Sequence, residues 1–277
     1  MHSGGMQIVE VTDFGVRSAV LRLTRRDTPL RFEIFPMVHV GEAAFYDAVT
    51  ERLRRCDLIV AEGIGRPESP GAPDLDADLG LDWPGLELND PAAEPRDRKP
   101  WRWDAVSALT AGYRIPARFE RFGLVEQNID YDALGVPVLY PDLTDAEFAA
   151  GWRAVPPWQR AIALAAGPLV ALDRLAFGSR RSFARGLEVS DTDWRERLAG
   201  SESMDDLLEL IGDQRDRLLM TALDAVHDRC SGDAITVAVV YGAAHVPPVT
   251  HGLRSLHGYS VRGAEWLTIF GLDQPRA

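Results

Sequence analysis

The chain has 277 residues, of which 46% are hydrophobic and 26% are charged, the balance of an ordinary globular protein with a full core. Its 30 basic and 42 acidic residues give a formal net charge of −12. This charge argues against nucleic acid or an anionic membrane as a partner, because both bind basic surfaces.

Cysteine content and hydropathy further limit the class of protein and its cellular compartment. Cys56 and Cys230 have no CxxC spacing, which excludes a disulfide framework and a cysteine zinc site, and we expect both to pack as small apolar residues. No basic segment followed by an apolar core opens the sequence. The longest apolar run, residues 161–172, is about half as long as a membrane span. We therefore predict a cytoplasmic protein with a buried helix or helix pair over this run. No pattern in the chain indicates its oligomeric state.

The N-terminal part of the chain has the pattern of strands followed by a βαβ unit. Residues 1–35 alternate in strand fashion between the turn signals TDFG and RDTP, which predicts a β-meander. Residues 42–55 have apolar positions at helical spacing, and a short continuous apolar run, CDLIVAEGIG, follows them. Strand, helix and strand in this order predict a βαβ unit with a parallel pair.

The centre of the chain differs from both ends. Residues 66–99 are rich in Pro, Gly and Asp and have no clear period, so we expect an irregular loop insertion. Residues 101–228 are mostly helical in pattern, with Thr144 and Glu147 spaced as a capping box. The chain then returns to strand, helix and strand. We therefore predict one α/β domain spanning residues 1–277. Its mixed central sheet is built from the N- and C-terminal segments, and the helical middle section covers the sheet edge.

Three chemically active residues follow predicted strands. His39 follows FEIF, Glu62 follows CDLIVA, and His245 follows TVAVVYG. Open α/β sheets bind ligands at the carboxyl ends of their strands, so we expect the three to converge. Two imidazoles and a carboxylate suit Zn, Mn, Fe or Co. Each residue also has a structural alternative, as a hydrogen-bonded histidine or as the partner of an arginine.

Two other groups of polar residues are expected at the surface. Arg180 and its basic neighbours in GSRRSFARG have the pattern of a solvated helix or loop. His227, His251 and His257 stand among charged residues or near glycine, and we predict that all three are exposed.

The segments HVGEAAFYDAVTERLRRCDLIVAEG and VAVVYGAAHVPPVTHGLRSLHGYSVRGAEWLTIF resemble the two ends of the TraB/GumN family, which includes the Tiki proteins. Gly242 and His245 match the family's second Gly-x-x-His motif, Glu62 fits its strand-end glutamate, and Arg215 fits its helical arginine. Pro36 stands where the first motif has glycine. The resemblance covers most of the chain outside the predicted insertion.

A middle stretch, GLVEQNIDYDALGVPVLYPDLTDAEF, resembles a bacterial subgroup of the same family. The resemblance rests on Glu126, Gln127, Tyr131 and Asp142. From it we expect Glu126 and Asp142 to contact the substrate, whose identity is unknown.

The resemblance implies a metal-dependent hydrolase, since Tiki proteins are described as metalloproteases that use manganese or cobalt. His39 and His245 would then hold a divalent ion (Mn, Co or Zn), and Glu62 would be a third ligand or the general base. Arg215 would stabilise an oxyanion, with Tyr241 as a second donor. Erythromycin esterase-like and haem-binding ChaN-like proteins are considered distant relatives of the TraB/GumN family. Two alternatives therefore stand beside the metal enzyme: a metal-free hydrolase with a histidine base oriented by Glu62, and a binding protein for haem or a small ligand.

Helical spacing makes a sharper prediction for Arg215. It stands four residues after Ile211 and four before Leu219, on the apolar stripe of a predicted helix. A buried guanidinium is costly unless it meets an acid, so we expect Glu62 or Asp142 to pair with it. Arg217 falls off the stripe and should be solvated.

Overall fold

The computed structural model describes residues 5–64, 122–177, 179–191 and 204–272, so the predicted insertion at 66–99 lies outside the described residues. The strands are β1 (Gln7–Val11), β2 (Gly15–Thr24), β3 (Arg31–Met37), β4 (Val40–Gly41), β5 (Leu58–Ala61), β6 (Val125–Glu126), β7 (Val138–Leu139), β8 (Val189–Ser190), β9 (Thr236–Gly242) and β10 (Ser260–Gly271). The helices are α1 (Ala43–Leu53), α4 (Asp145–Ala154), α5 (Pro157–Phe177), α6 (Arg180–Ala184), α8 (Asp205–Leu208), α9 (Gln214–Cys230) and α10 (Val246–His257), with shorter turns η2 (Asp132–Leu134), η4 (Glu209–Asp213) and η5 (Ala243–His245).

Within the described residues, eight strands form one mixed sheet. The order is β7-β5-β9-β3-β2-β1-β8, and β10 pairs along β2. β1, β2 and β3 form the predicted antiparallel meander, and the C-terminal strands β9 and β10 pair with the N-terminal strands β3 and β2. The predicted mixed α/β fold, with a central sheet built from both ends of the chain, is confirmed.

The predicted βαβ unit is present, but its two strands are not neighbours. β9 lies between β3 and β5 and runs parallel to both. The central position suits its sequence, TVAVVYG, because a strand covered on both faces by protein has a continuous apolar run. Local sequence predicts the crossover and cannot reveal that a strand from the far end of the chain inserts into it.

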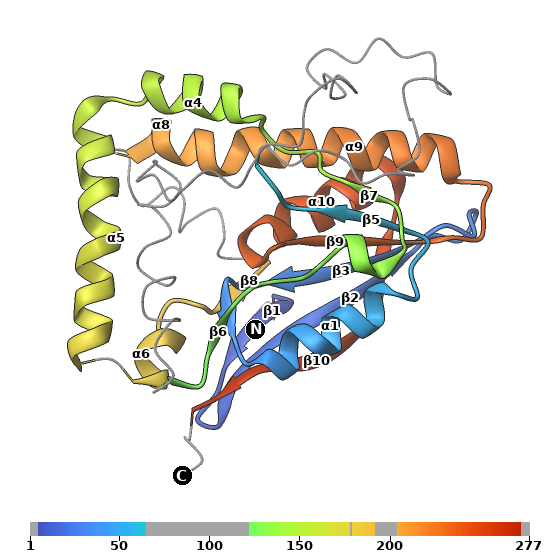
Figure 1. Cartoon of the computed structure of the whole chain (residues 1–277). Helices are drawn as coiled ribbons and strands as arrows, with labels where there is room; N and C mark the ends of the chain where they lie inside the picture. Colours follow the sequence, from blue (N-terminus) through green and yellow to red (C-terminus); the bar gives the residue numbers. More distant parts are fainter. Residues whose placement is uncertain (1–4, 65–121, 178, 192–203, 273–277) are drawn as a thin grey trace.

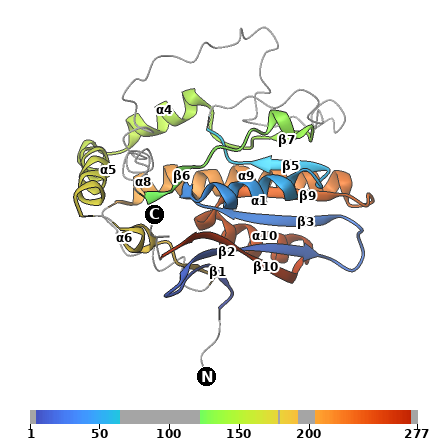
Figure 2. The same cartoon turned by 60° about the horizontal axis from the view of Figure 1, so that its bottom comes forward.

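Helices cover both faces of the sheet. Figure 1 and Figure 2 show α1 on one face and α9 with α10 on the other. α1 turns Phe45, Val49 and Leu53 into the core, as its spacing predicts. The predicted capping box opens α4: the Thr144 hydroxyl accepts from the Glu147 amide, and the Glu147 carboxylate accepts from the Thr144 amide.

The apolar run at residues 161–172 folds differently from its prediction. It belongs to one unbroken helix, α5, and much of it is exposed: Ile162 is 51% and Leu169 is 64% accessible. The buried stripe consists of small residues four apart, Ala163, Gly167 and Ala171. The helix therefore packs closely through its small side chains, while its larger ones face outward. Within the described residues, no helix is both long and apolar enough to cross a membrane.

Arg180 is buried, and the prediction of a solvated side chain was wrong for it. It donates to the carbonyl of Phe122 at 2.9 Å and that of Gly271 at 3.0 Å, and it pairs with Glu42 at 2.5 Å. Gly123, with φ of +57°, approaches so closely that a Cβ there would lie 2.8 Å from the guanidinium. Arg180 therefore donates to backbone carbonyls where separate segments meet. A run of basic residues in the sequence does not indicate this structural function.

Both cysteines are free, with Cys56 buried and Cys230 partly buried, as expected for small apolar side chains. Burial, with Glu33 and Asp57 nearby, raises the pKa of the Cys56 thiol to about 12. A thiol of this pKa stays protonated and is a weak nucleophile.

Candidate functional site

The three strand-end residues lie along one edge of the sheet. β3, β9 and β5 are adjacent and parallel, so their carboxyl ends meet there. His39 lies two residues past β3, Glu62 directly follows β5, and His245 closes the turn η5 after β9. The ladder extends to the site, since the Glu62 amide donates to the carbonyl of Val240 at 3.0 Å. The predicted convergence on one edge is confirmed.

Arg215, on the first turn of α9, pairs with two acids at this edge. Its Nε lies 2.8 Å from Oδ1 of Asp142, and its Nη2 lies 2.6 Å from Oδ2 of Asp142 and 2.7 Å from Oε1 of Glu62. The guanidinium side chain is 9% exposed and that of Asp142 is fully buried. Asp142 and Glu62 together raise the pKa of Arg215 despite the opposing effect of burial. Both predicted partners of Arg215 are confirmed.

Arg217 provides the contrast that the helical spacing predicts. Its side chain is 63% exposed and pairs at the surface with Glu209. Two arginines two residues apart on one helix therefore differ completely in environment, and Arg217 is solvated as predicted.

Glu62 is held in its ionised form. Its second oxygen, Oε2, accepts a hydrogen bond from the Gly242 amide at 2.8 Å. Burial alone would raise the pKa of Glu62, but Arg215, His245 and His39 outweigh burial and lower it to about 2. Gly242 is close enough that a Cβ there would lie 3.3 Å from Oε2. The carboxylate is therefore a fixed negative charge and a poor proton acceptor near neutral pH.

His245 forms a hydrogen-bonded pair with Asp216 of α9. Its Nδ1 lies 2.6 Å from Oδ1 of Asp216, and the residue is 8% exposed. The ring of Tyr241 meets the imidazole edge to face, with centroids 5.7 Å apart at 82°. A carboxylate on Nδ1 selects the tautomer whose Nε2 accepts a proton or binds a metal. In this pair, both the orientation and the tautomer of the His245 ring are therefore defined.

Sequence reasoning missed Asp216. Helical spacing identified Arg215 as inward-facing, but Asp216 is one step further round the helix and is not on the apolar stripe. A π-turn, η4, directly precedes α9 and changes the register between Ile211 and the residues after it. Asp216 could have been sought on chemical grounds, because a strand-end histidine in a functional site needs a carboxylate or carbonyl to orient it.

His39 lies in the turn after β3, at the rim of the same site. Desolvation by the surrounding protein lowers the pKa of its imidazole, Glu62 opposes this effect, and Arg215 adds to it. Its carbonyl accepts from the amide of Gln127 at 2.8 Å, and the next residue, Val40, pairs with Glu126 between β4 and β6. The segment at Glu126 and Gln127 therefore lies against the His39 turn.

Tyr241 and Asp142 lie behind the site in supporting positions. The Tyr241 hydroxyl donates to the carbonyl of Pro141 at 3.1 Å, and burial, then Asp142 and Glu62, raise the pKa of Tyr241 well above its usual value. Asp142 also accepts from the amides of Gly63 at 3.0 Å and Leu143 at 2.8 Å. Its four hydrogen bonds orient Arg215 and the turn after β5.

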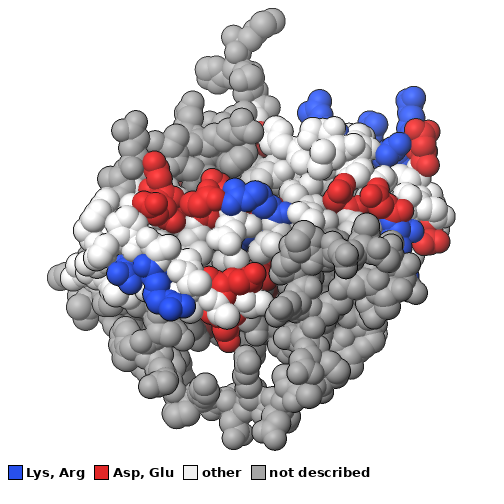
Figure 3. All heavy atoms as spheres, turned by 90° about the horizontal axis from the view of Figure 1, so that it is seen from above, with Lys and Arg blue, Asp and Glu red and all other residues white. Residues whose placement is uncertain are grey.

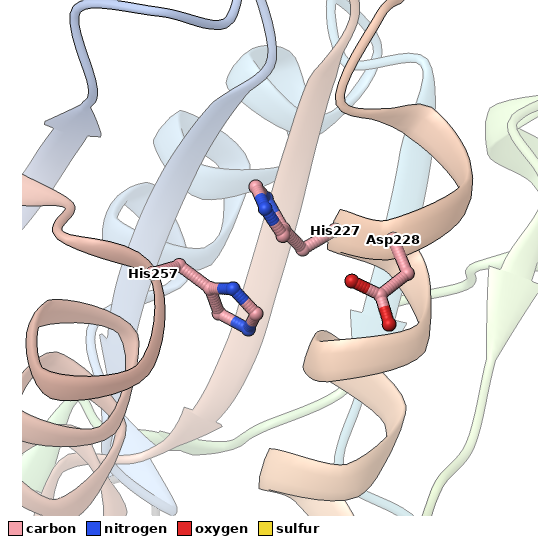
Figure 4. A group of neighbouring side chains, drawn as sticks. All are labelled: His227, Asp228 and His257. Carbon is pink, nitrogen blue, oxygen red and sulfur yellow. The ribbon is translucent and has the colours of Figure 1, made fainter.

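The donor atoms of His39, Glu62 and His245 do not all lie within 4.8 Å of one another. Within the described residues, His227, Asp228 and His257 do meet this spacing and form a group that could hold a metal ion (Figure 4).

This second group overturns part of the surface prediction for the histidines. His227 is 7% exposed and the His257 side chain is 11% exposed, whereas His251 is exposed as predicted. His227 and His257 come from the C-terminal turns of α9 and α10, which meet through the packing of the two helices. Charged neighbours along the sequence suggested a solvated surface, but helix packing buries the imidazoles.

Comparison of this chain with protein-family models, curated proteins and solved structures finds no match. The charge distribution is mixed where it is visible: on the face in Figure 3, acidic and basic side chains of the described residues are interspersed. Function therefore has to be inferred from the residues of the site.

Proposed function

We propose that the strand-end site is the active site of a hydrolase for an ester, lactone or amide bond. The observation that carries the proposal is the pairing of His245 with Asp216, at 2.6 Å, beside the ion-paired Arg215. A proton acceptor and a fixed positive charge then lie at the carboxyl ends of the parallel strands β3, β9 and β5, where such folds bind ligands.

His245 is the group suited to activate water. The Asp216 carboxylate accepts a hydrogen bond from Nδ1–H, so Nε2 is the nitrogen that can take a proton from a water molecule, and the carboxylate then stabilises the imidazolium. Glu62 cannot share this function, because a carboxyl with a pKa of about 2 is far too weak a base near neutral pH. We therefore assign the base to His245 and an anchoring function to Glu62.

Arg215 is suited to bind a substrate oxygen or developing negative charge. Its Nε and Nη2 are occupied by Asp142 and Glu62, whereas Nη1 has a long contact of 3.5 Å to the carbonyl of Ile211. The N–H groups of Nη1 are therefore the donors that Arg215 can offer to a substrate. Because the two acids fix the plane of the guanidinium, little reorganisation is needed when charge develops.

The resemblance to the TraB/GumN family adds a divalent ion to this proposal. His39 and His245 would hold it with Glu62, and the ion would lower the pKa of a bound water. The carboxylate on Nδ1 of His245 suits a metal ligand, but the three donors are too widely spaced for a closed site here. The assigned proton transfer therefore depends on His245 and Asp216 alone, and metal dependence is measured separately.

The test uses untagged full-length protein on chromogenic esters, lactones and aminoacyl anilides. We expect turnover that His245→Gln abolishes and that His251→Gln, at an exposed histidine of α10, leaves unchanged. The same assay after chelation, and with Mn, Co or Zn restored, separates a metal-dependent from a metal-free hydrolase. Turnover that survives His245→Gln in folded protein would contradict the proposal.

A further inference from the structure

We infer that His227, Asp228 and His257 form a second, structural binding site for a divalent ion such as zinc, which ties the C-terminal end of α9 to that of α10. The site is separate from the proposed hydrolase site and does not depend on it. Figure 4 shows the three neighbouring side chains, two from α9 and one from the last residue of α10.

The spacing of the donor atoms is close to that of a metal site. One donor atom from each residue lies within 4.8 Å of the other two. Ligand bonds of about 2.0–2.2 Å hold donors about 3.4 Å apart in a tetrahedral site, so small side-chain rotations close the difference. Asp228 is exposed and can make this adjustment. Two imidazoles, one carboxylate and a water molecule suit zinc or cobalt better than magnesium or calcium, which prefer oxygen ligands.

Contacts around the rings leave one suitable nitrogen on each histidine. His227 Nδ1 lies 3.1 Å from the Tyr259 hydroxyl, and His257 Nε2 lies 2.6 Å from Oδ1 of Asp224. The candidate ligands are therefore Nε2 of His227 and Nδ1 of His257. Metal-binding imidazoles commonly hydrogen-bond through their other nitrogen, which fixes the tautomer and orients the ring. The ring centroids are 4.0 Å apart and the planes are inclined by 39°, so both rings border the same space.

The charges near this position are mixed, with two carboxylates and two helix ends that favour a cation. Asp224 and Asp228 stand three residues before and one after His227, on neighbouring parts of the helix surface. The C-terminal ends of α9 and α10 add the negative ends of two helix dipoles. Arg25 is near enough to act on His227 and opposes a cation, and Arg26 and Arg262 line the hollow beside His257. Asp224 and Asp228 oppose these positive charges.

Such an ion would stabilise the pair of helices that supports the hydrolase site. α9 carries Arg215 and Asp216 near its start, and α10 begins directly after His245. The proposed ion lies at the opposite ends of both helices. We therefore expect it to affect stability, because it binds the folded protein and joins two elements, without taking part in the reaction.

The test is metal binding and thermal unfolding of untagged, chelator-treated full-length protein, with zinc, cobalt and magnesium added separately. Zinc or cobalt should bind at this site with one equivalent per chain and raise Tm by about 5 °C at a hundredfold excess over Kd, whereas magnesium should not. Asp228→Asn and His257→Gln should each remove this equivalent and the Tm rise. The matched variants Asp233→Asn and His251→Gln change exposed residues and should retain both.

The variants also separate this site from a metal in the hydrolase site. An equivalent that His245→Gln removes and Asp228→Asn retains belongs to the strand-end site, and if it is the sole equivalent the inference is overturned. An equal Tm rise in wild type, Asp228→Asn and His257→Gln overturns it as well. Because Asp228 is exposed, its variant is expected to fold and keeps the test informative if His257→Gln is destabilised.

Discussion

Arg215 donates through two nitrogens to both oxygens of Asp142, with Nε 2.8 Å from Oδ1 and Nη2 2.6 Å from Oδ2. The two residues are 73 positions apart and form a planar, two-bonded ion pair inside the protein. Such a pair is costly to break, because removing one partner leaves the other charge buried without compensation.

We predict that Asp142→Asn destabilises the protein by about 3–5 kcal/mol, as measured by urea unfolding, because it removes the carboxylate from the buried Arg215. Glu209→Gln removes the acid from the exposed Arg217 pair and should cost less than about 1 kcal/mol. Similar small losses from both variants would mean that the buried pair contributes no more than a surface one.

The two arginines of α9 give a matched test of activity. Arg215→Lys keeps the charge but cannot make the same planar contacts, so we expect turnover to fall by about a hundredfold with the fold retained. Arg217→Lys should leave turnover unchanged, because its side chain is solvated. Circular dichroism and kcat on a substrate from the hydrolase screen measure both effects. Equal, negligible effects would remove Arg215 from the site.

Part of this site was predictable because helix and strand periodicity determine direction. The apolar stripe through Ile211 and Leu219 placed Arg215 inward, and apolar runs ending at Glu62 and His245 placed those residues at strand ends. A guanidinium that faces inward needs an acid, which limited its partners to few candidates.

The remainder depended on contacts between distant segments. Asp216 meets His245 across 29 positions, and Arg180 meets Phe122 across 58, and nothing in either local pattern encodes the partner. Charged neighbours also misled the predictions for His227 and Arg180, because periodicity reports apolar faces and not which polar residue finds buried partners. The insertion of β9 between β3 and β5 was hidden for the same reason.

The lowered pKa of Glu62 makes stability depend on acid pH. The carboxyl has a pKa of about 2 in the folded protein, below its ordinary value of about 4.5, so ionised Glu62 stabilises the fold at neutral pH. This contribution, of the order of 3 kcal/mol, is present above about pH 4.5 and is lost as the pH falls toward 2. Urea midpoints measured from pH 7 to pH 2 should fall less steeply for Glu62→Gln than for wild type. Parallel curves for the two proteins would show that the Glu62 carboxyl is not stabilised in its charged form.

The central claim is that Asp216 makes His245 the base of a hydrolase, and the most direct measurement is kcat of Asp216→Asn on a substrate that wild type turns over. An amide can donate to Nδ1 and select the wrong tautomer, so we predict that kcat falls by about 10²–10⁴-fold while the Tm changes little. Asp213→Asn, at an exposed acid three residues earlier, should retain wild-type kcat. A wild-type kcat for Asp216→Asn would contradict the assignment of His245 and Asp216 as the catalytic pair.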